Sequence, residues 1–130
     1  QSGLRGFARL TQYCKDMAAG MNGLDCLVLP QVGTEAIPGV VCEAHACGKP
    51  VIASNLDEIP EAFSIAGYAK LVKRGSAEEL AAAMNDWAQK PRLGMDERWK
   101  LHRLVAERFS LEKAAIDLAE LYDELAAKNV

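Results

Sequence analysis

The chain has 130 residues, of which 50% are hydrophobic and 25% are charged, so it suits one compact domain with a hydrophobic core. Its formal net charge of −3 and its acidic sequence pI argue against binding of nucleic acid or of an anionic membrane through a global electrostatic field. No segment predicts a transmembrane helix and no signal peptide opens the chain, so we expect a cytoplasmic location.

The first quarter of the chain carries weak structural signals. A stretch near Leu4 suggests a strand and its turn, and residues 11–21 predict a short amphipathic helix. Asn22 and Gly23 then form a turn signal.

Two short apolar runs predict neighbouring strands of a parallel sheet. Residues 26–30 are too short for a helix and are bounded by Asp25 and Pro30. Residues 51–54 form the second run. Between them we expect a loop and then a helix, because parallel strands need a crossover connection.

The expected helix has clear start and stop signals. Pro38 suits the first helical position, where its missing N–H group costs nothing, and residues 39–46 continue the helix. Gly48 and Pro50 then end it.

The start of this helix predicts an anion-binding site. Ligands of such sheets bind at the carboxyl ends of the strands, where a helix N-terminus presents free N–H groups and a partial positive charge. Gly39 has no side chain to block a ligand, so the amides of Gly39 and Val40 can approach a diphosphate. Glu35 and Glu43 flank this start and suit sugar hydroxyls. We therefore expect a nucleotide sugar here.

The rest of the chain predicts one more strand and three helices. Residues 68–72 form the strand, Ser76 with Glu79 forms a capping box, and Ser110 caps the last helix. The three apolar stripes, which we interpret as packing surfaces, are Ala77, Leu80, Ala81, Met84, Trp87 and Ala88; Met95, Trp99, His102, Val105, Ala106 and Phe109; and Leu111, Ala114, Ala115, Leu118, Leu121, Tyr122 and Leu125.

No metal or disulfide site emerges from the sequence. The cysteines Cys14, Cys26, Cys42 and Cys47 have no Cys-x-x-Cys spacing and suit small buried hydrophobic positions. His45 and His102 lack partners at metal-ligand spacing, and His102 is expected to be a half-buried structural residue.

These elements predict a single α/β domain over residues 1–130. We expect a partial Rossmann-like parallel sheet of three to four strands, the fourth near the start, with helices on both faces.

A string of motifs extends over most of the chain from about Asp25. It consists of Glu35 and Glu43 with seven residues between them, Ala44-x-Ala46-Cys-Gly-Lys-Pro-Val-Ile-Ala-Ser54, Ile59-Pro-Glu61, Val72-Lys-Arg-Gly75-Ser-Ala-Glu-Glu-Leu80, and Phe109-Ser-x-Glu112-Lys113. This string resembles group 1 (family 4-like) retaining glycosyltransferases of the GT-B fold, in the second half of their C-terminal, donor-binding domain. The sequence departs from the commonest pattern at Ala36-Ile37-Pro38, where Gly-Phe-Gly is frequent.

The resemblance implies a role for each matching residue. Glu35, the catalytic candidate, would position the donor sugar, and Glu43 would hydrogen-bond the nucleotide ribose. The implied donor-binding residues are Glu35, Ile37, Pro38, Gly39, Val40 and Glu43. Pro38 removes one N–H group that would otherwise face the phosphates.

The resemblance also implies an activity and its partners. The full-length protein would transfer a sugar from a nucleoside diphosphate sugar, with retention and without a metal or other cofactor, to a polysaccharide or lipid-linked acceptor. The acceptor would bind an N-terminal domain that this chain lacks. The chain would also lack the family's basic pair, which neutralises the donor's phosphates and to which Arg5, Lys73 and Arg74 do not correspond. We therefore expect the isolated fragment to be inactive. The full-length protein would be cytoplasmic or peripheral to the inner membrane.

Other interpretations stay open. One is a nucleotide-sugar epimerase or phosphorylase on the same fold, and another is a non-catalytic assembly fragment. In the simplest interpretation, Glu35 complements the helix dipole and Glu43 is a solvated helix residue. Because strand 26–30 would leave a bare edge and some helix faces would be exposed, we also expect the fragment to self-associate.

Overall fold

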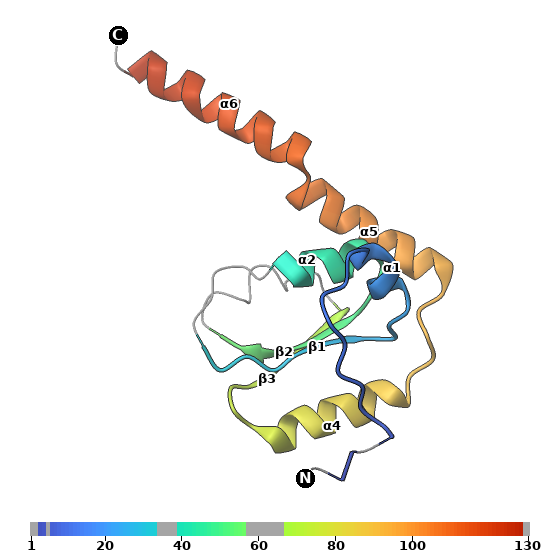
Figure 1. Cartoon of the computed structure of the whole chain (residues 1–130). Coiled ribbons are helices and arrows are strands. Elements are labelled where there is room, and N and C mark those ends of the chain that lie inside the picture. Colours follow the sequence, from blue (N-terminus) through green and yellow to red (C-terminus); the bar gives the residue numbers. More distant parts are fainter. Residues whose placement is uncertain (1–2, 5, 34–38, 57–66, 129–130) are drawn as a thin grey trace.

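A computed structural model of the chain describes residues 3–4, 6–33, 39–56 and 67–128. Figure 1 shows the order of the elements along the chain. They are α1 (Met17–Asn22), β1 (Leu27–Leu29), α2 (Gly39–Ala46), β2 (Val51–Asn55), β3 (Ala69–Lys73), α4 (Ala77–Ala88), α5 (Met95–Phe109) and α6 (Leu111–Lys128).

The strands form a three-stranded parallel sheet in the order β1-β2-β3. Ile52 of the central strand is paired with Val28 on one side and with Lys70 on the other. Residues 51–54 of β2 are all buried, as expected for a central strand that is covered on both faces. The three strands that the sequence predicts are confirmed, each with its bounds shifted by at most one residue.

The start of the chain differs from the sequence prediction. Among the described residues before β1 there is no strand that joins the sheet, so the fourth strand is not found. The first helix is also shorter than residues 11–21, because Asp16 caps it: the Asp16 carboxylate accepts a hydrogen bond from the amide of Ala19 at 2.9 Å. This cap places the first helical residue at Met17.

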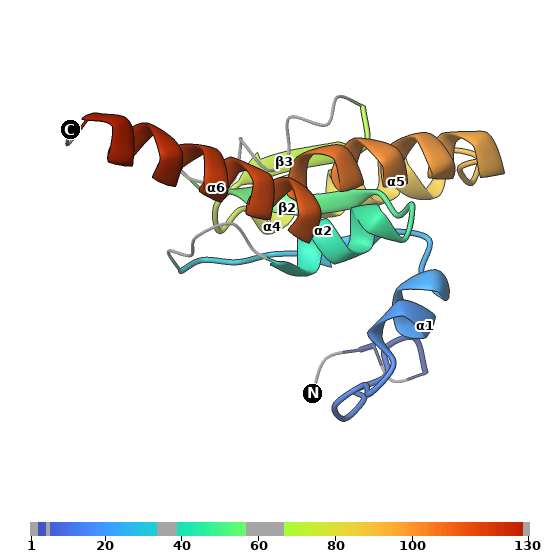
Figure 2. The ribbon, with the colours of Figure 1, turned by 90° about the horizontal axis from the view of Figure 1, so that it is seen from above.

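Helices cover both faces of the sheet, as predicted. In Figure 1, α2 and α5 lie above the sheet and α4 lies below it, whereas Figure 2 shows α1 set to one side. Because side chains alternate along a strand, β2 supplies both layers. Val51 and Ala53 pack with Val41 of α2, and Ile52 packs with Ala83 of α4.

Helix α5 packs on α2 rather than on the sheet. Leu101 and Val105, one turn apart, form its buried face. His102 is half-buried, as predicted, and its Nδ1–H group donates to the carbonyl oxygen of Ala46 at 2.7 Å. The predicted stripe is therefore partly wrong: it omits Leu101 and includes Trp99, which is 56% exposed.

The predicted cap of α6 is confirmed, and the predicted capping box of α4 is present in modified form. Ser76 Oγ accepts from the amide of Glu79 at 3.2 Å, but the Glu79 carboxylate accepts from the amide of Lys73 at 2.7 Å. That carboxylate therefore ties α4 to the end of β3. Ser110 Oγ accepts from the amide of Lys113 at 3.2 Å and caps α6.

Helix α6 extends away from the sheet (Figure 1), and none of its described residues is buried. The prediction that its apolar stripe packs is therefore wrong within this chain. Large side chains of the stripe, Leu111, Leu118, Leu121, Tyr122 and Leu125, are all exposed, because no described element lies along their face. Among the described residues, no helix combines the length and the apolar character that a membrane crossing needs.

The cysteine prediction holds for three positions. Cys26, Cys42 and Cys47 are half-buried and each packs against a different core cluster. Cys14 is exposed, which contradicts the expectation for that residue. It lies before α1, where Asp16 starts the helix, so no packed element covers it.

Candidate functional site

The carboxyl ends of the three strands and the start of α2 meet at one edge of the sheet, which we call the carboxyl edge. Parallel strands end on the same side by construction, and Figure 1 shows this edge at the left. The predicted loops after β1 and β2 include residues 34–38 and 57–66, which lie outside the described residues. Glu35, Ile37 and Pro38 fall in this group.

The start of α2 is exposed at Gly39. Among the described residues, no heavy atom lies within 4 Å of a Cβ atom added there. Val41 and Ala44 are fully buried against the sheet, so the packing of α2 fixes the direction of its axis. The amides of Gly39 and Val40 belong to the first turn, where a helix provides no acceptor for its N–H groups.

Glu43 lies one turn further along α2 than Gly39, and its side chain is exposed. The separation of four residues in a helix places the two positions on the same face. The structure thus brings Gly39, Val40 and Glu43 together at one helix start.

A shallow hollow of about 190 Å³ lies at the carboxyl edge on the other face of the sheet, between the strand ends and the start of α4. Ser54, at the carboxyl end of β2, lines it and is only 3% exposed. Lys73 lines it from the end of β3, and the next residue, Arg74, is exposed. Sequence reasoning had not singled out Ser54, although a polar residue that ends a buried strand is a usable signal.

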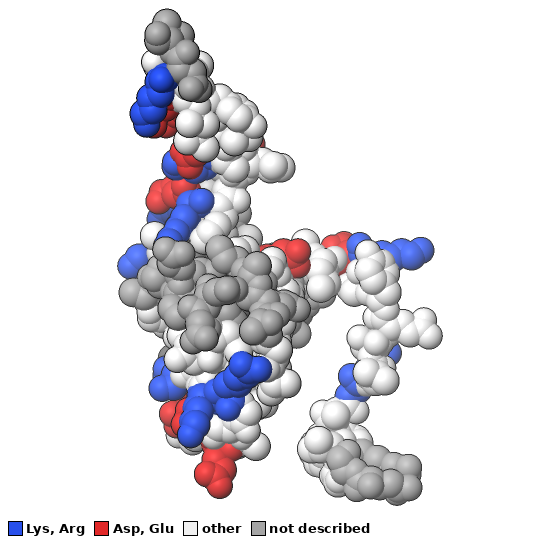
Figure 3. All heavy atoms as spheres, turned by 90° about the vertical axis from the view of Figure 1, so that its left-hand side faces the viewer, with Lys and Arg blue, Asp and Glu red and all other residues white. Residues whose placement is uncertain are grey.

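The carboxyl edge carries positive charge near its loops. Figure 3 views this side of the molecule and shows basic side chains gathered next to the residues that are not described. Lys73 and Arg74 do not match the family's basic pair in the sequence, but the structure places them at the end of β3. Gly75, with φ of +73°, makes the turn that follows them. This edge therefore suits an anionic ligand.

Comparison with known proteins identifies the family of this chain. The sequence model of the family described as "Glycosyl transferases group 1" matches residues 1–90. This chain belongs to the group 1 glycosyl transferases. Their model therefore covers β1, α2, β2, β3 and α4, the elements that build the carboxyl edge.

One curated member of the glycosyl transferase class aligns with part of the chain. The phosphatidyl-myo-inositol mannosyltransferase of Mycobacterium leprae (strain TN) is 36% identical over 67 residues, which are 52% of this chain. The chain spans only 18% of the length of that relative.

Two half-buried cysteines of this glycosyl transferase chain, one on α2 and one before β1, show little chemical activation. Burial raises the pKa of the Cys42 thiol on α2, and it raises the pKa of Cys26 to about 11. Both thiols therefore stay protonated at neutral pH, which disfavours a nucleophilic role. In the described ranges, no group of three or more His, Cys, Asp or Glu side chains is arranged to hold a metal ion.

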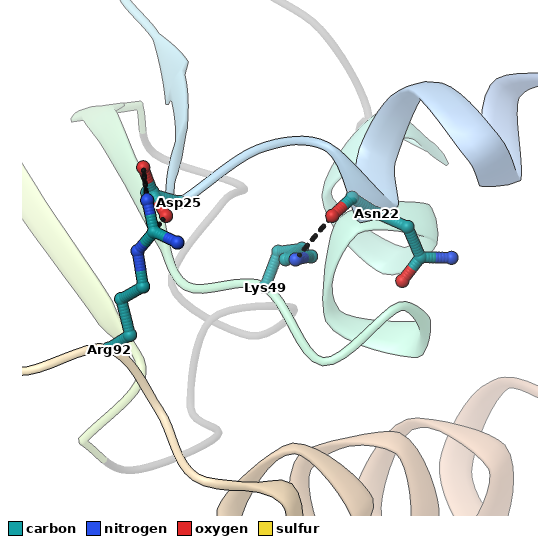
Figure 4. Close-up of polar contacts among 4 residues, drawn as sticks. All are labelled: Asn22, Asp25, Lys49 and Arg92. Atoms are coloured by element: carbon teal, nitrogen blue, oxygen red, sulfur yellow. Dashed lines mark hydrogen bonds and ion pairs between the residues drawn. The ribbon is translucent and has the colours of Figure 1, made fainter.

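The opposite edge of the sheet, which we call the amino edge, holds a second polar cluster (Figure 4). Lys49 Nζ donates to the carbonyl oxygen of Asn22 at 2.9 Å, and Arg92 forms an ion pair with Asp25 at 2.8 Å. Arg98 Nη2 donates to the side-chain oxygen of Asn22 at 2.9 Å. Sequence reasoning missed this cluster, because its members lie far apart in the chain and share no motif.

Proposed function

We propose that this chain is the donor-binding part of a glycosyltransferase that moves a sugar from a nucleoside diphosphate sugar to an acceptor, with retention of anomeric configuration. The observation that supports this most strongly is the start of α2 at the carboxyl edge, where no described residue comes within 4 Å of a Cβ atom added at Gly39. Family membership supplies the reaction class.

The start of α2 suits the leaving diphosphate. The first-turn N–H groups and the helix dipole favour an anion, and they act where negative charge develops as the sugar departs. Because Gly39 has no Cβ atom, the phosphate oxygens can approach the backbone closely. Lys73 and Arg74 add positive charge to the same edge.

The two glutamates have positioning roles in this proposal. Glu43 is exposed one turn beyond Gly39, at a position that suits a hydrogen bond with the ribose hydroxyls. Glu35 lies outside the described residues, and we assign it the hydroxyls of the donor sugar because it precedes the helix start. Ile37 and Pro38 complete the proposed donor contacts. The reaction that we propose needs no metal.

The remaining functions belong to the full-length protein. We propose that residues 1–130 form one partial domain, and that the acceptor is a polysaccharide or a lipid-linked sugar bound by a further domain. The mycobacterial relative is a phosphatidyl-myo-inositol mannosyltransferase, which favours the lipid-linked class. A cytoplasmic protein that is peripheral to the inner membrane suits such an acceptor.

A titration of this chain with UDP, GDP and ADP, followed by amide NMR, tests the proposed donor site. We expect saturable shifts at Gly39, Val40 and Glu43, with the preferred base giving the lowest Kd. Glu43→Gln should weaken binding by roughly tenfold, the effect of one charge-assisted hydrogen bond. Glu107→Gln, on an exposed part of α5, is the matched control and should leave Kd unchanged.

Two outcomes contradict parts of this proposal. Absence of shifts with all three nucleotides would favour a non-catalytic assembly fragment. Release of product from a nucleoside diphosphate sugar by the purified chain would contradict the expectation that the fragment is inactive alone.

A further inference from the structure

The amino edge of the sheet is hollowed. A cavity of about 600 Å³ lies between the end of α1, the residues that precede the three strands, the end of α4 and the start of α5. Its lining includes Asn22, Lys49, Tyr68, Trp87, Arg92 and Arg98. This cavity lies at the opposite end of the strands from Gly39, so its contents cannot touch a ligand at the carboxyl edge.

Lys49 brings an ammonium group to this cavity. The residue is only 7% exposed, and its Nζ donates to the carbonyl oxygen of Asn22 at 2.9 Å. An ammonium group has three N–H donors, and one backbone carbonyl satisfies only one of them. Burial, together with the nearby charge of Arg98, lowers the pKa of Lys49, and the charge of Asp25 only partly opposes this shift.

Arg98 contributes a second cation with an unused donor. Its Nη2 group donates to Asn22 Oδ1 at 2.9 Å and to the carbonyl oxygen of Cys47 at 3.3 Å. Its Nε–H group is buried and has no hydrogen-bond partner among the described residues. A buried donor without an acceptor costs free energy, so an acceptor at this position would be stabilising.

The acidic residues of the cavity are already engaged. The Asp25 carboxylate is paired with Arg92, through Nε at 2.8 Å and Nη2 at 3.2 Å. The Glu97 carboxylate accepts from the amide of Gly94 at 3.1 Å. Over the part of the chain that the structure describes, the salt bridges are Arg92 with Asp25 and Lys113 with Asp117. Among the described residues, neither Lys49 nor Arg98 therefore forms a salt bridge with a carboxylate.

Two more lysines and two aromatic side chains complete the lining. Lys90 and Lys100 line the cavity, and Lys90 Nζ lies 4.2 Å from the centre of the Trp87 ring. Tyr68, the residue before β3, also lines the cavity. The cavity thus combines excess positive charge with flat apolar surface.

We propose that this cavity binds the phosphate group of a phosphomonoester. A phosphate dianion supplies acceptor oxygens to Lys49 and Arg98, and it neutralises both cations at once. The volume of about 600 Å³ leaves room for an organic group beside the phosphate, against Trp87 and Tyr68. This site is independent of the proposed donor site, because the two lie at opposite ends of the strands.

Titration of the chain with inorganic phosphate, followed by NMR of the Arg98 Nε–H signal, tests the proposal. The signal is assigned by its disappearance in Arg98→Lys. We expect it to shift saturably with added phosphate, together with the amides of Gly48 and Lys49. Potassium chloride at equal ionic strength should not reproduce these shifts. A linear response, or the same response to chloride, would overturn the proposal.

Three variants make the test specific. Arg98→Lys keeps the charge but loses Nε, so phosphate affinity at the Gly48 and Lys49 amides should fall by roughly tenfold. Arg103→Lys, an exposed position on the same helix that does not line the cavity, should leave the affinity unchanged. Gly39→Ala should also leave it unchanged, which separates this site from phosphate bound at the start of α2. Equal losses in all three variants would overturn the assignment.

Two phosphate sources are then compared in the same assay. Glycerol 3-phosphate represents a soluble phosphomonoester, and vesicles that contain phosphatidic acid represent a lipid headgroup. If either compound binds more tightly than inorganic phosphate, and if Arg98→Lys removes this difference in affinity, the result supports the site. The compound that binds more tightly identifies the source of the phosphate group. If neither binds more tightly than inorganic phosphate, the proposal that the cavity also binds the organic group of a phosphomonoester is wrong.

Discussion

The Nδ1–H group of His45 donates to the carbonyl oxygen of Lys49 across 2.9 Å, inside the core between α2 and the sheet. A carbonyl oxygen only accepts hydrogen bonds, so Nδ1 carries the proton in this contact. This bond closes the turn that joins α2 to β2. It makes the turn depend on a fully buried histidine.

We predict that acid weakens the fold through His45. Burial lowers its pKa below 6.5, so the unfolded chain binds more protons as the pH falls below 6.5. The contribution to stability is therefore fully present above pH 6.5 and declines below it, by at most about 1.4 kcal/mol per pH unit. Urea unfolding between pH 7.5 and 5.5 measures this slope.

Two histidine variants separate this effect from general acid sensitivity. His45→Gln should flatten the slope, whatever it does to stability at pH 7.5, whereas His102→Gln should retain it. A slope that survives in His45→Gln would assign the pH dependence to other groups.

We predict that Gly48→Ala strongly destabilises the chain. Gly48 has φ of +67°, and an added Cβ atom would lie 2.7 Å from Cβ of Arg98. Conformational strain of about 1–2 kcal/mol and a steric clash of about 1–3 kcal/mol should add together. Gly75→Ala isolates the clash, because Gly75 has φ of +73° but nothing within 4 Å of its added Cβ. Equal losses of unfolding free energy in Gly48→Ala and Gly75→Ala would show that the contact with Arg98 of α5 adds no steric clash.

We predict that Leu101→Ala destabilises the chain by about 2–5 kcal/mol, because it leaves a cavity where α5 packs on α2. Leu101 is completely buried, whereas Leu118 of α6 is 50% exposed. Leu118→Ala should therefore cost less than about 1 kcal/mol. Urea unfolding of both variants at low protein concentration makes the comparison, and similar losses would contradict the placement of these helices.

We predict that Gly39→Ala keeps the fold and loses nucleotide affinity. The added methyl group meets no atom of the described residues within 4 Å, and alanine favours a helix over glycine by about 0.5–1 kcal/mol. The same methyl group stands where the phosphate oxygens should approach the first turn. Calorimetric titration with the preferred nucleotide should show weaker binding beside an unchanged or higher melting temperature, and unchanged affinity would place the diphosphate elsewhere.

We predict that the isolated chain self-associates through α6. The exposed apolar stripe of this helix includes Leu121 and Tyr122, at 49% and 62% exposure. Burial of such side chains in a second copy is favourable. Sedimentation velocity at micromolar concentration should show dimers, and Leu121→Glu should give monomers. A monomeric mass for the original chain would contradict the prediction, while dimers in Leu121→Glu would point instead to the edge of β1.

Local sequence determined the order of the elements. Short apolar runs gave the three strands, because buried parallel strands are continuous in hydrophobicity. Ser76 and Ser110 marked helix starts, because a side-chain oxygen can satisfy an amide that the helix leaves without an acceptor. Gly39, Val40 and Glu43 could be placed at one helix start because they are close together in the chain.

The tertiary structure alone decided what distant residues do. No local pattern distinguishes Leu101, which is buried, from Trp99, which is exposed, since that depends on how α5 lies on α2. The exposure of α6 likewise depends on which surfaces the rest of the chain offers it. Lys49 and Arg98 come together at the amino edge only when the sheet, α1 and α5 are in place. Electrostatic and hydrogen-bonding partners depend on distance in space. The periodicity of the sequence does not indicate which distant residues will be close.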